Sequence, residues 1–188
     1  MGFAIAEKCA QLGAEVILVS GPVNLKPVHP NIKIIRVQTA KQMFEACIEN
    51  FPDCDSAILS AAVADFSPEV TYNNKVKREK KDWKINLQPN PDIAAQLGTM
   101  KTGKQVLAGF ALETENELEN AKSKLRKKNF DFIVINSLKD EGAGFETDTN
   151  KISILDKNNI IDKFELKSKT EVSSDIVDKL IAMLGTIS

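Results

Sequence analysis

Apolar and polar positions in the first third of the chain follow two periods, one typical of helices and one typical of buried strands. Residues 2–12 carry apolar side chains at the spacing of one helix face, and Gly13 follows as a helix stop. Residues 15–20 form a short, β-branched and apolar run, which predicts a buried parallel strand. The same patterns predict three further elements, namely a strand at 32–37, a helix over 40–51 and a buried strand at 56–62.

A polar stretch at residues 67–90 interrupts this alternation, which then resumes. The pattern predicts a short helix after Pro91 and six later elements, namely strands at 105–111, 130–135, 151–155 and 160–166 and helices over 115–127 and 172–184. The segment 156–159 is rich in turn formers, so the two strands around it are expected to form a hairpin.

Alternation of helices and strands is typical of a doubly wound, Rossmann-like α/β fold, a mostly parallel sheet with helices on both faces. We expect one domain over residues 1–188, with a basic flap and a C-terminal hairpin. Such a sheet normally begins with a strand and a glycine turn before its first helix. Here the first predicted element is the helix, and only Gly2 represents the turn, so we expect the natural N-terminal strand and glycine-rich loop to be missing from this sequence.

Composition narrows the function classes mainly by exclusion. Lys and Arg total 25 against 26 for Asp and Glu, so the net charge of −1 gives no overall attraction to nucleic acid or membrane. No apolar run approaches the roughly 20 residues of a membrane-spanning helix, and no signal peptide is apparent, which favours a cytoplasmic protein. Cys9 and Cys47 are predicted core thiols, and a single histidine, His29, argues against a Ser-His-Asp triad.

Ligands of open α/β sheets bind beyond the carboxyl ends of the strands. Four segments lie there in the predicted fold, at 20–23, 61–65, 90–93 and 109–114. The small residues Ala61 and Ala62 would let a ligand approach the backbone closely. Asp65 adds one carboxylate, which serves either a ligand or the cap of a tight loop.

Basic residues concentrate in two places. The stretch 75–84 holds six Lys and Arg residues, which suit a solvated hairpin, a flap that closes on a triphosphate, or a nucleic-acid surface. Its only aromatic residue is Trp83, which argues against nucleic acid. The second cluster, 122–128, ends a predicted helix, where cations also favour the helix dipole. The residues alone therefore predict an α/β protein with an anionic, phosphorylated ligand at the strand ends.

Seven motifs in a fixed order make this more specific. They are 1–6 (MGFAIA), 18–23 (LVSGPV), 61–66 (AAVADF), 75–77 (KVK), 90–93 (NPDI), 109–114 (GFALET) and 145–150 (FETDTN). Together they resemble the phosphopantothenate–cysteine ligase family, also called phosphopantothenoylcysteine synthetase, which forms the ligase domain of the bacterial bifunctional coenzyme A biosynthesis protein. The resemblance covers essentially the whole chain.

The resemblance implies formation of the amide between 4′-phosphopantothenate and L-cysteine through an acyl-nucleotide intermediate, with release of pyrophosphate. It implies CTP as the nucleotide, with ATP less favoured, because the form of the 61–65 motif looks bacterial. It also implies Mg²⁺, a homodimer with the site near the subunit interface, and a full-length form fused to a flavin-dependent decarboxylase.

The same resemblance assigns residues. It implies contacts of Ala61, Ala62 and Asp65 with both nucleotide and phosphopantothenate. Asp65 is also our candidate ligand for Mg²⁺, with ribose and substrate as its alternative partners. Lys75 matches the family's flap lysine. Lys75 and Asp65 are the two implied catalytic residues. The remaining implied nucleotide-binding residues are Asn90, Pro91, Asp92, Ile93, Phe110, Lys124 and Lys128.

Two alternatives stay open at this stage. A nicotinamide-dependent reductase would need a complete GxGxxG turn and, for the short-chain type, a Tyr-xxx-Lys pair. The only tyrosine, Tyr72, has Val76 four places on, which argues against this class. The other alternative is a nucleotide sensor that kept the fold but lost catalytic activity. Retention of Asp65 and Lys75 argues against such a loss.

Overall fold

The computed structural model describes residues 1–72, 74–75, 77, 84–113, 116–137 and 149–186. In chain order the elements are α1 (Gly2–Gln11), β1 (Val16–Ser20), β2 (Ile32–Arg36), α2 (Ala40–Asn50), a 3₁₀ turn (Phe51–Asp53), β3 (Ser56–Leu59), β4 (Phe66–Pro68), β5 (Leu87–Pro89), α3 (Ile93–Met100), β6 (Val106–Glu113), α4 (Glu117–Lys127), β7 (Phe132–Ser137), β8 (Thr149–Asn150), β9 (Ile152–Asp156), β10 (Ile161–Lys163), β11 (Lys167–Ser168) and α5 (Lys169–Gly185).

The central sheet has five strands in the order β10-β9-β7-β6-β3. Strands β3, β6 and β7 are parallel, whereas β9 and β10 form the predicted antiparallel hairpin at one edge. A second, two-stranded parallel sheet joins β1 to β2. The predicted α/β class, with a mostly parallel sheet and a C-terminal hairpin, is confirmed.

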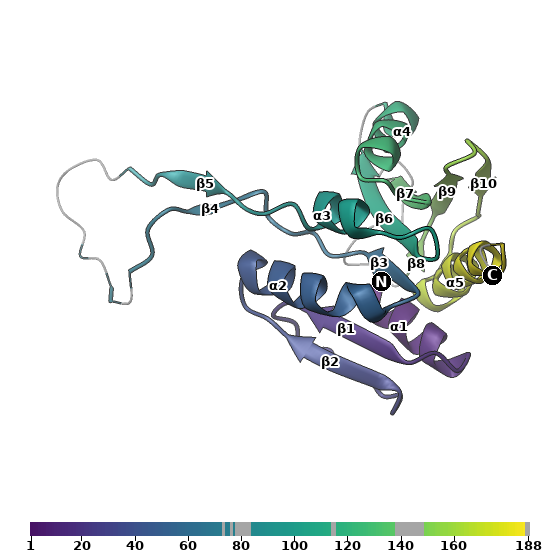
Figure 1. Cartoon of the computed structure of the whole chain (residues 1–188), viewed down its shortest axis with the longest axis horizontal. Coiled ribbons are helices and arrows are strands. Elements are labelled where there is room, and N and C mark those ends of the chain that lie inside the picture. Colours follow the sequence, from purple (N-terminus) through teal and green to yellow (C-terminus); the bar gives the residue numbers. More distant parts are fainter. Residues whose placement is uncertain (73, 76, 78–83, 114–115, 138–148, 187–188) are drawn as a thin grey trace.

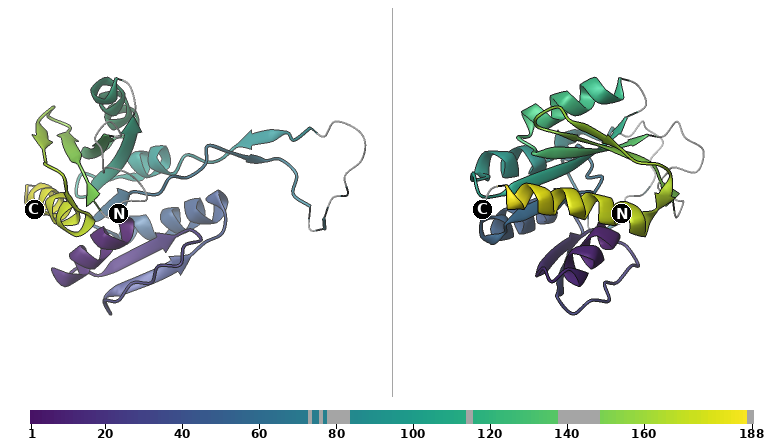
Figure 2. Two further views of the ribbon diagram at one scale, coloured as in Figure 1. Left: turned by 180° about the vertical axis from the view of Figure 1, so that it is seen from behind. Right: turned by 90° about the vertical axis from the view of Figure 1, so that its right-hand side faces the viewer.

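Helices cover both faces of the sheet (Figures 1 and 2). Leu107 and Ile133 point into one apolar cluster, which the helices α2, α3 and α4 close. Their chain neighbours Ala108 and Phe132 point to the opposite face, into a cluster closed by α1 and α5. All four side chains are fully buried. The period of two along each strand therefore produces two separate cores, as expected for a strand buried on both faces.

The two sheets share these helical layers. Val19 of β1 and Leu59 of β3 pack in the same cluster beneath α2, and α1 lies on the other face. Gly2 brings the first turn of α1 close to the end of β3, since a Cβ there would lie 2.7 Å from Ser60 Oγ. Among the described residues, β1 and β3 each pair with a strand on one side only.

Local sequence explains several element boundaries. Thr39 and Gln42 form a capping box that begins α2. Ser168 and Glu171 form another, so α5 begins at Lys169, three residues before the predicted start. Strand β3 ends at Leu59 rather than at 62, because its pairing with β6 ends there.

The predicted polar flap forms a two-stranded antiparallel arm, β4 with β5, that projects from the body (Figure 1). Exposed apolar side chains follow the arm: Phe66, Val70, Tyr72, Ile85 and Leu87. Most of the basic stretch lies outside the described residues. Only Lys75, Lys77 and Lys84 of its cations are described, and all three are exposed.

Candidate functional site

Asn90 joins two predicted site segments beyond the carboxyl end of β3. Its side-chain Nδ2 donates to the carbonyl of Ala64 at 2.8 Å, and its backbone N donates to the carbonyl of Asp65 at 2.8 Å. The loop that carries Ala61 and Ala62 is therefore fastened to the start of α3. Both alanines are exposed, so their backbone is accessible to a ligand.

Asp92 connects the start of α3 with the end of α4. It is the N-cap of α3, and its Oδ1 accepts a hydrogen bond from Ala95 N at 2.9 Å. Its Oδ2 forms an ion pair with Nζ of Lys128, which is the C-cap of α4. Partial burial alone would raise the pKa of Asp92, but the hydrogen bonds from Lys128 and Ala95 and the lysine charge lower it overall. Two predicted nucleotide-binding residues thus lie together.

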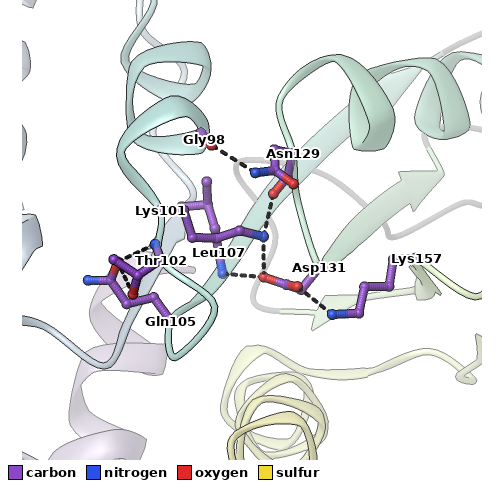
Figure 3. A network of polar contacts seen from close by, with 8 residues as sticks. All are labelled: Gly98, Lys101, Thr102, Gln105, Leu107, Asn129, Asp131 and Lys157. Carbon is purple, nitrogen blue, oxygen red and sulfur yellow. Dashed lines mark hydrogen bonds and ion pairs between the residues drawn. The ribbon is translucent and has the colours of Figure 1, made fainter. Parts of the chain in front are cut away.

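The backbone of α3 lies unusually close to the turn that follows α4. A Cβ added to Gly98 would lie 2.1 Å from the carbonyl oxygen of Lys128, so only glycine fits there. Asn129, with a φ of 52°, donates from Nδ2 to the Gly98 carbonyl at 2.8 Å. Lys101 Nζ donates to the Asn129 carbonyl at 2.7 Å (Figure 3). These contacts fix the backbone of Lys128 relative to α3.

A buried carboxylate at the amino end of β7 anchors this arrangement (Figure 3). Asp131, 3% exposed, accepts from Lys101 Nζ at 2.8 Å, Lys157 Nζ at 2.9 Å and Leu107 N at 2.8 Å. Its burial favours the neutral acid, but these donors outweigh that effect and lower its pKa. The network ties the end of α3 to the starts of β6 and β7. This network was not predicted, and the one available signal was a charged residue, Asp131, within the otherwise apolar predicted strand at 130–135.

The structure leaves other predicted residues apart. Phe110 packs in the cluster beneath α1 and α5, on the face opposite to α3 and α4. Lys75 lies on the outer part of the arm and contacts no other predicted site residue within the described ranges. Ile93 is 8% exposed and packs in the core, so its side chain serves the fold. Pro91 and Lys124 are exposed, and Lys124 lies one helical turn before Lys128.

Asp65 is the predicted metal ligand. It is exposed, and its carboxylate accepts no hydrogen bond from the described residues. Within the described ranges, no group of three or more His, Cys, Asp or Glu side chains is placed to hold a metal ion. One free carboxylate suits Mg²⁺ that is held mainly by phosphate oxygens and water. It does not suit a metal held by protein ligands alone.

The fold and this geometry define an α/β protein whose candidate anion site lies where the loop after β3 meets the start of α3. A family model described as "DNA/pantothenate metabolism flavoprotein C-terminal domain" matches residues 1–184. The chain belongs to this family, and the resemblance inferred from its motifs is confirmed.

Individual relatives agree with this. The chain is 55% identical over 184 residues to "Cysteine/Cysteine sulfinic acid decarboxylase" from an unknown prokaryotic organism, covering 98% of this chain and 51% of the relative. It is 40% identical over 183 residues to "Coenzyme A biosynthesis bifunctional protein CoaBC" from Bacillus subtilis (strain 168), covering 97% and 45%. The chain thus spans about half the length of these curated relatives.

A crystal structure of the C-terminal domain of CoaBC superimposes with a TM-score of 0.82 at 39% identity, covering 98% of this chain and 84% of that one. The match supports the fold described above over nearly the full chain. No helix in the described ranges has both the length and the apolar character needed to cross a membrane.

Proposed function

We propose that this chain is the ligase domain that joins 4′-phosphopantothenate to L-cysteine in coenzyme A biosynthesis. One observation carries the proposal: the Asn90 and Asp92–Lys128 contacts lie in a chain that matches the C-terminal domain of CoaBC over 98% of its length. The name of that protein, coenzyme A biosynthesis bifunctional protein, supports the pathway. The two substrates follow from the resemblance of the motifs.

The proposed reaction has two steps. A carboxylate oxygen of phosphopantothenate attacks the α-phosphorus of the nucleotide, and the bond to pyrophosphate breaks. The amine of cysteine then attacks the acyl carbon, loses a proton and displaces the nucleoside monophosphate. Both partners of the first step are anions, so catalysis must align them and neutralise their charge.

Each proposed residue has a role that suits its position. Lys124 and Lys128 would bind phosphate oxygens near the N-terminus of α3, where the helix dipole also favours an anion. Ala61 and Ala62 would let the acyl-nucleotide lie against the backbone. Lys75 would approach from the arm and stabilise charge as the α-phosphate is attacked, since an arm can close after both substrates bind.

The proposed nucleotide is CTP, with ATP as the weaker substrate, and the proposed ion is Mg²⁺. Asp65 would hold the ion together with triphosphate oxygens, and Mg²⁺ would reduce the negative charge on the phosphates. Asn90, Pro91, Ile93 and Phe110 are proposed to surround the nucleotide. Because Phe110 lies across the sheet from Lys128, this arrangement requires the nucleotide to span the strand ends.

We also propose a homodimer formed through the arm. Its apolar side chains, Phe66 and Leu87 among them, are 59% and 61% exposed on a thin two-stranded element. An exposed apolar surface of this kind is typical of an interface, and a second copy of the arm has matching chemistry. Light scattering coupled to size exclusion tests this: a dimer is expected, and Phe66→Ser with Leu87→Ser should shift it to monomer. A wild-type monomer would contradict it.

Pyrophosphate release tests the proposed function. The protein carrying this domain is incubated with phosphopantothenate, cysteine, Mg²⁺ and either CTP or ATP. Release that requires phosphopantothenate and is faster with CTP is expected. Release of CO₂ from cysteine or cysteine sulfinic acid alone tests the activity named for the 55% identical relative. This domain is expected to give none, and CO₂ without amide formation would contradict the proposal.

A further inference from the structure

Lys128 is expected to bind nucleotide, yet it already has a partner. Its Nζ forms an ion pair with Asp92 Oδ2, and neither side chain is deeply buried, at 27% and 51% exposed. An ion pair with this much exposure is exchangeable, because water can replace either partner at low cost. The pair therefore sits where an incoming phosphate would have to compete with a carboxylate.

The surrounding contacts hold the backbone in place, so this competition involves only the side chains of Asp92 and Lys128. The backbone of Lys128 is held by the close approach of Gly98 and by the Asn129 bond to the Gly98 carbonyl at 2.8 Å. The other oxygen of Asp92 is held by Ala95 N at 2.9 Å as the cap of α3. The ammonium group of Lys128 can therefore change partner without movement of either helix.

Resting on the proposed function, we infer that Asp92 is a regulatory counter-ion: it neutralises Lys128 in the free protein, yields it to the triphosphate on binding, and takes it back when the nucleotide products leave. The carboxylate competes with the triphosphate for the ammonium group of Lys128. This weakens nucleotide affinity and favours release. Asp92, which the resemblance implies to be a nucleotide-binding residue, acts here through Lys128, as a positioning residue and not as a direct ligand of the nucleotide.

Asp92→Asn is the informative substitution. Asparagine is as good an N-cap as aspartate, so the start of α3 should be preserved. The negative charge is lost, and Lys128 no longer has to leave a carboxylate. The dissociation constant for CTP, and for inorganic tripolyphosphate as a base-free probe, should fall by about two- to fivefold, in line with the strength of an exposed pair. The effect should shrink in high salt.

Two variants provide the controls. Glu45→Gln removes one negative charge from an exposed ion pair with Lys41 on α2, and it should leave both dissociation constants unchanged. Lys128→Met should weaken binding, and adding Asp92→Asn to it should then have little further effect. That non-additivity identifies Lys128 as the group through which Asp92 acts.

Isothermal titration of the four variants with both probes, in the presence of Mg²⁺, decides the question. Tighter binding by Asp92→Asn, with little further effect of this substitution in Lys128→Met, supports the inference. Equal or weaker binding by Asp92→Asn, with normal binding by the unmodified protein, overturns the inference and leaves the ligase proposal standing. If the unmodified protein binds neither probe, the nucleotide site itself fails, and the proposed function with it.

Discussion

The side-chain amide of Asn90 lies 2.8 Å from the carbonyl oxygen of Ala64, although 26 residues and the whole arm separate them. Asn90 N also donates to the carbonyl of Asp65. The arm therefore begins and ends at a single fastened point beside the end of β3. Any movement of the arm would pivot there, while Ala61 and Ala62 keep their place relative to α3.

Asn90→Ala should loosen this point without unfolding the domain. The substitution removes one exposed hydrogen bond, so a loss of about 0.5–1.5 kcal/mol in the free energy of unfolding is expected. The loss in free energy of nucleotide binding should exceed the loss in free energy of unfolding, because the loop at 61–65 loses its fixed position. Urea denaturation and CTP titration measure the two effects. Unchanged CTP affinity would show that the loop does not contribute.

Asp131→Asn should be strongly destabilising. It leaves Lys101, whose side chain is 10% exposed, as a buried charge without its carboxylate partner. Breaking such a pair costs about 3–5 kcal/mol. Lys157→Met is the matched comparison, since Lys157 is 54% exposed and should cost much less. Equal losses from the two substitutions in urea denaturation would contradict this account.

The carboxylate of Asp131 should also make the free energy of unfolding depend on pH in the acid range. The pKa of Asp131 is lowered in the folded protein, below its ordinary value of 3.8. Its contribution is therefore fully present above that value and is lost as the pH falls from about 4 through the lowered pKa. The free energy of unfolding of the wild type should fall over this range. Asp131→Asn should fall less steeply, because it lacks that titration.

Gly98→Ala tests the packing of α3 against Lys128. The added methyl would lie 2.1 Å from a backbone carbonyl, which cannot move as a side chain would. The helix must shift, at a cost of about 1–3 kcal/mol as for other overpacked sites. Gly103→Ala is a suitable control, because nothing lies within 4 Å of a Cβ there. Thermal denaturation of the two variants should differ clearly.

Lys75→Gln tests the proposed catalytic role of the arm. Lys75 is exposed and apart from the other site residues in the free protein. A group that approaches only as the phosphate is attacked should contribute to the transition state more than to substrate binding. Turnover should therefore fall far more than nucleotide affinity in steady-state kinetics. Equal loss of both would refute this role.

Periodicity and local chemistry in the sequence determined the elements and the class of fold. The helical spacing in residues 2–12, the capping residue Thr39 and the turn formers at 156–159 all act between near neighbours, so their effect can be predicted from the chain alone. The seven motifs and their order identified the family, because together they contain most of the predicted site residues. Boundaries were less certain: Leu59 ends β3 because its partner strand provides no further pairing.

Only the tertiary structure decided which candidate residues meet. Strand periodicity predicts that Phe110 faces away from Gly109 and Ala111, but not which helices cover each face. Asp92 and Lys128 are 36 positions apart in the sequence. Asp131 binds Lys101, after α3, and Lys157, in the hairpin turn. Such contacts depend on how α3, α4 and the hairpin pack on the sheet. That packing is set by the sum of many apolar contacts, which no short stretch of sequence contains.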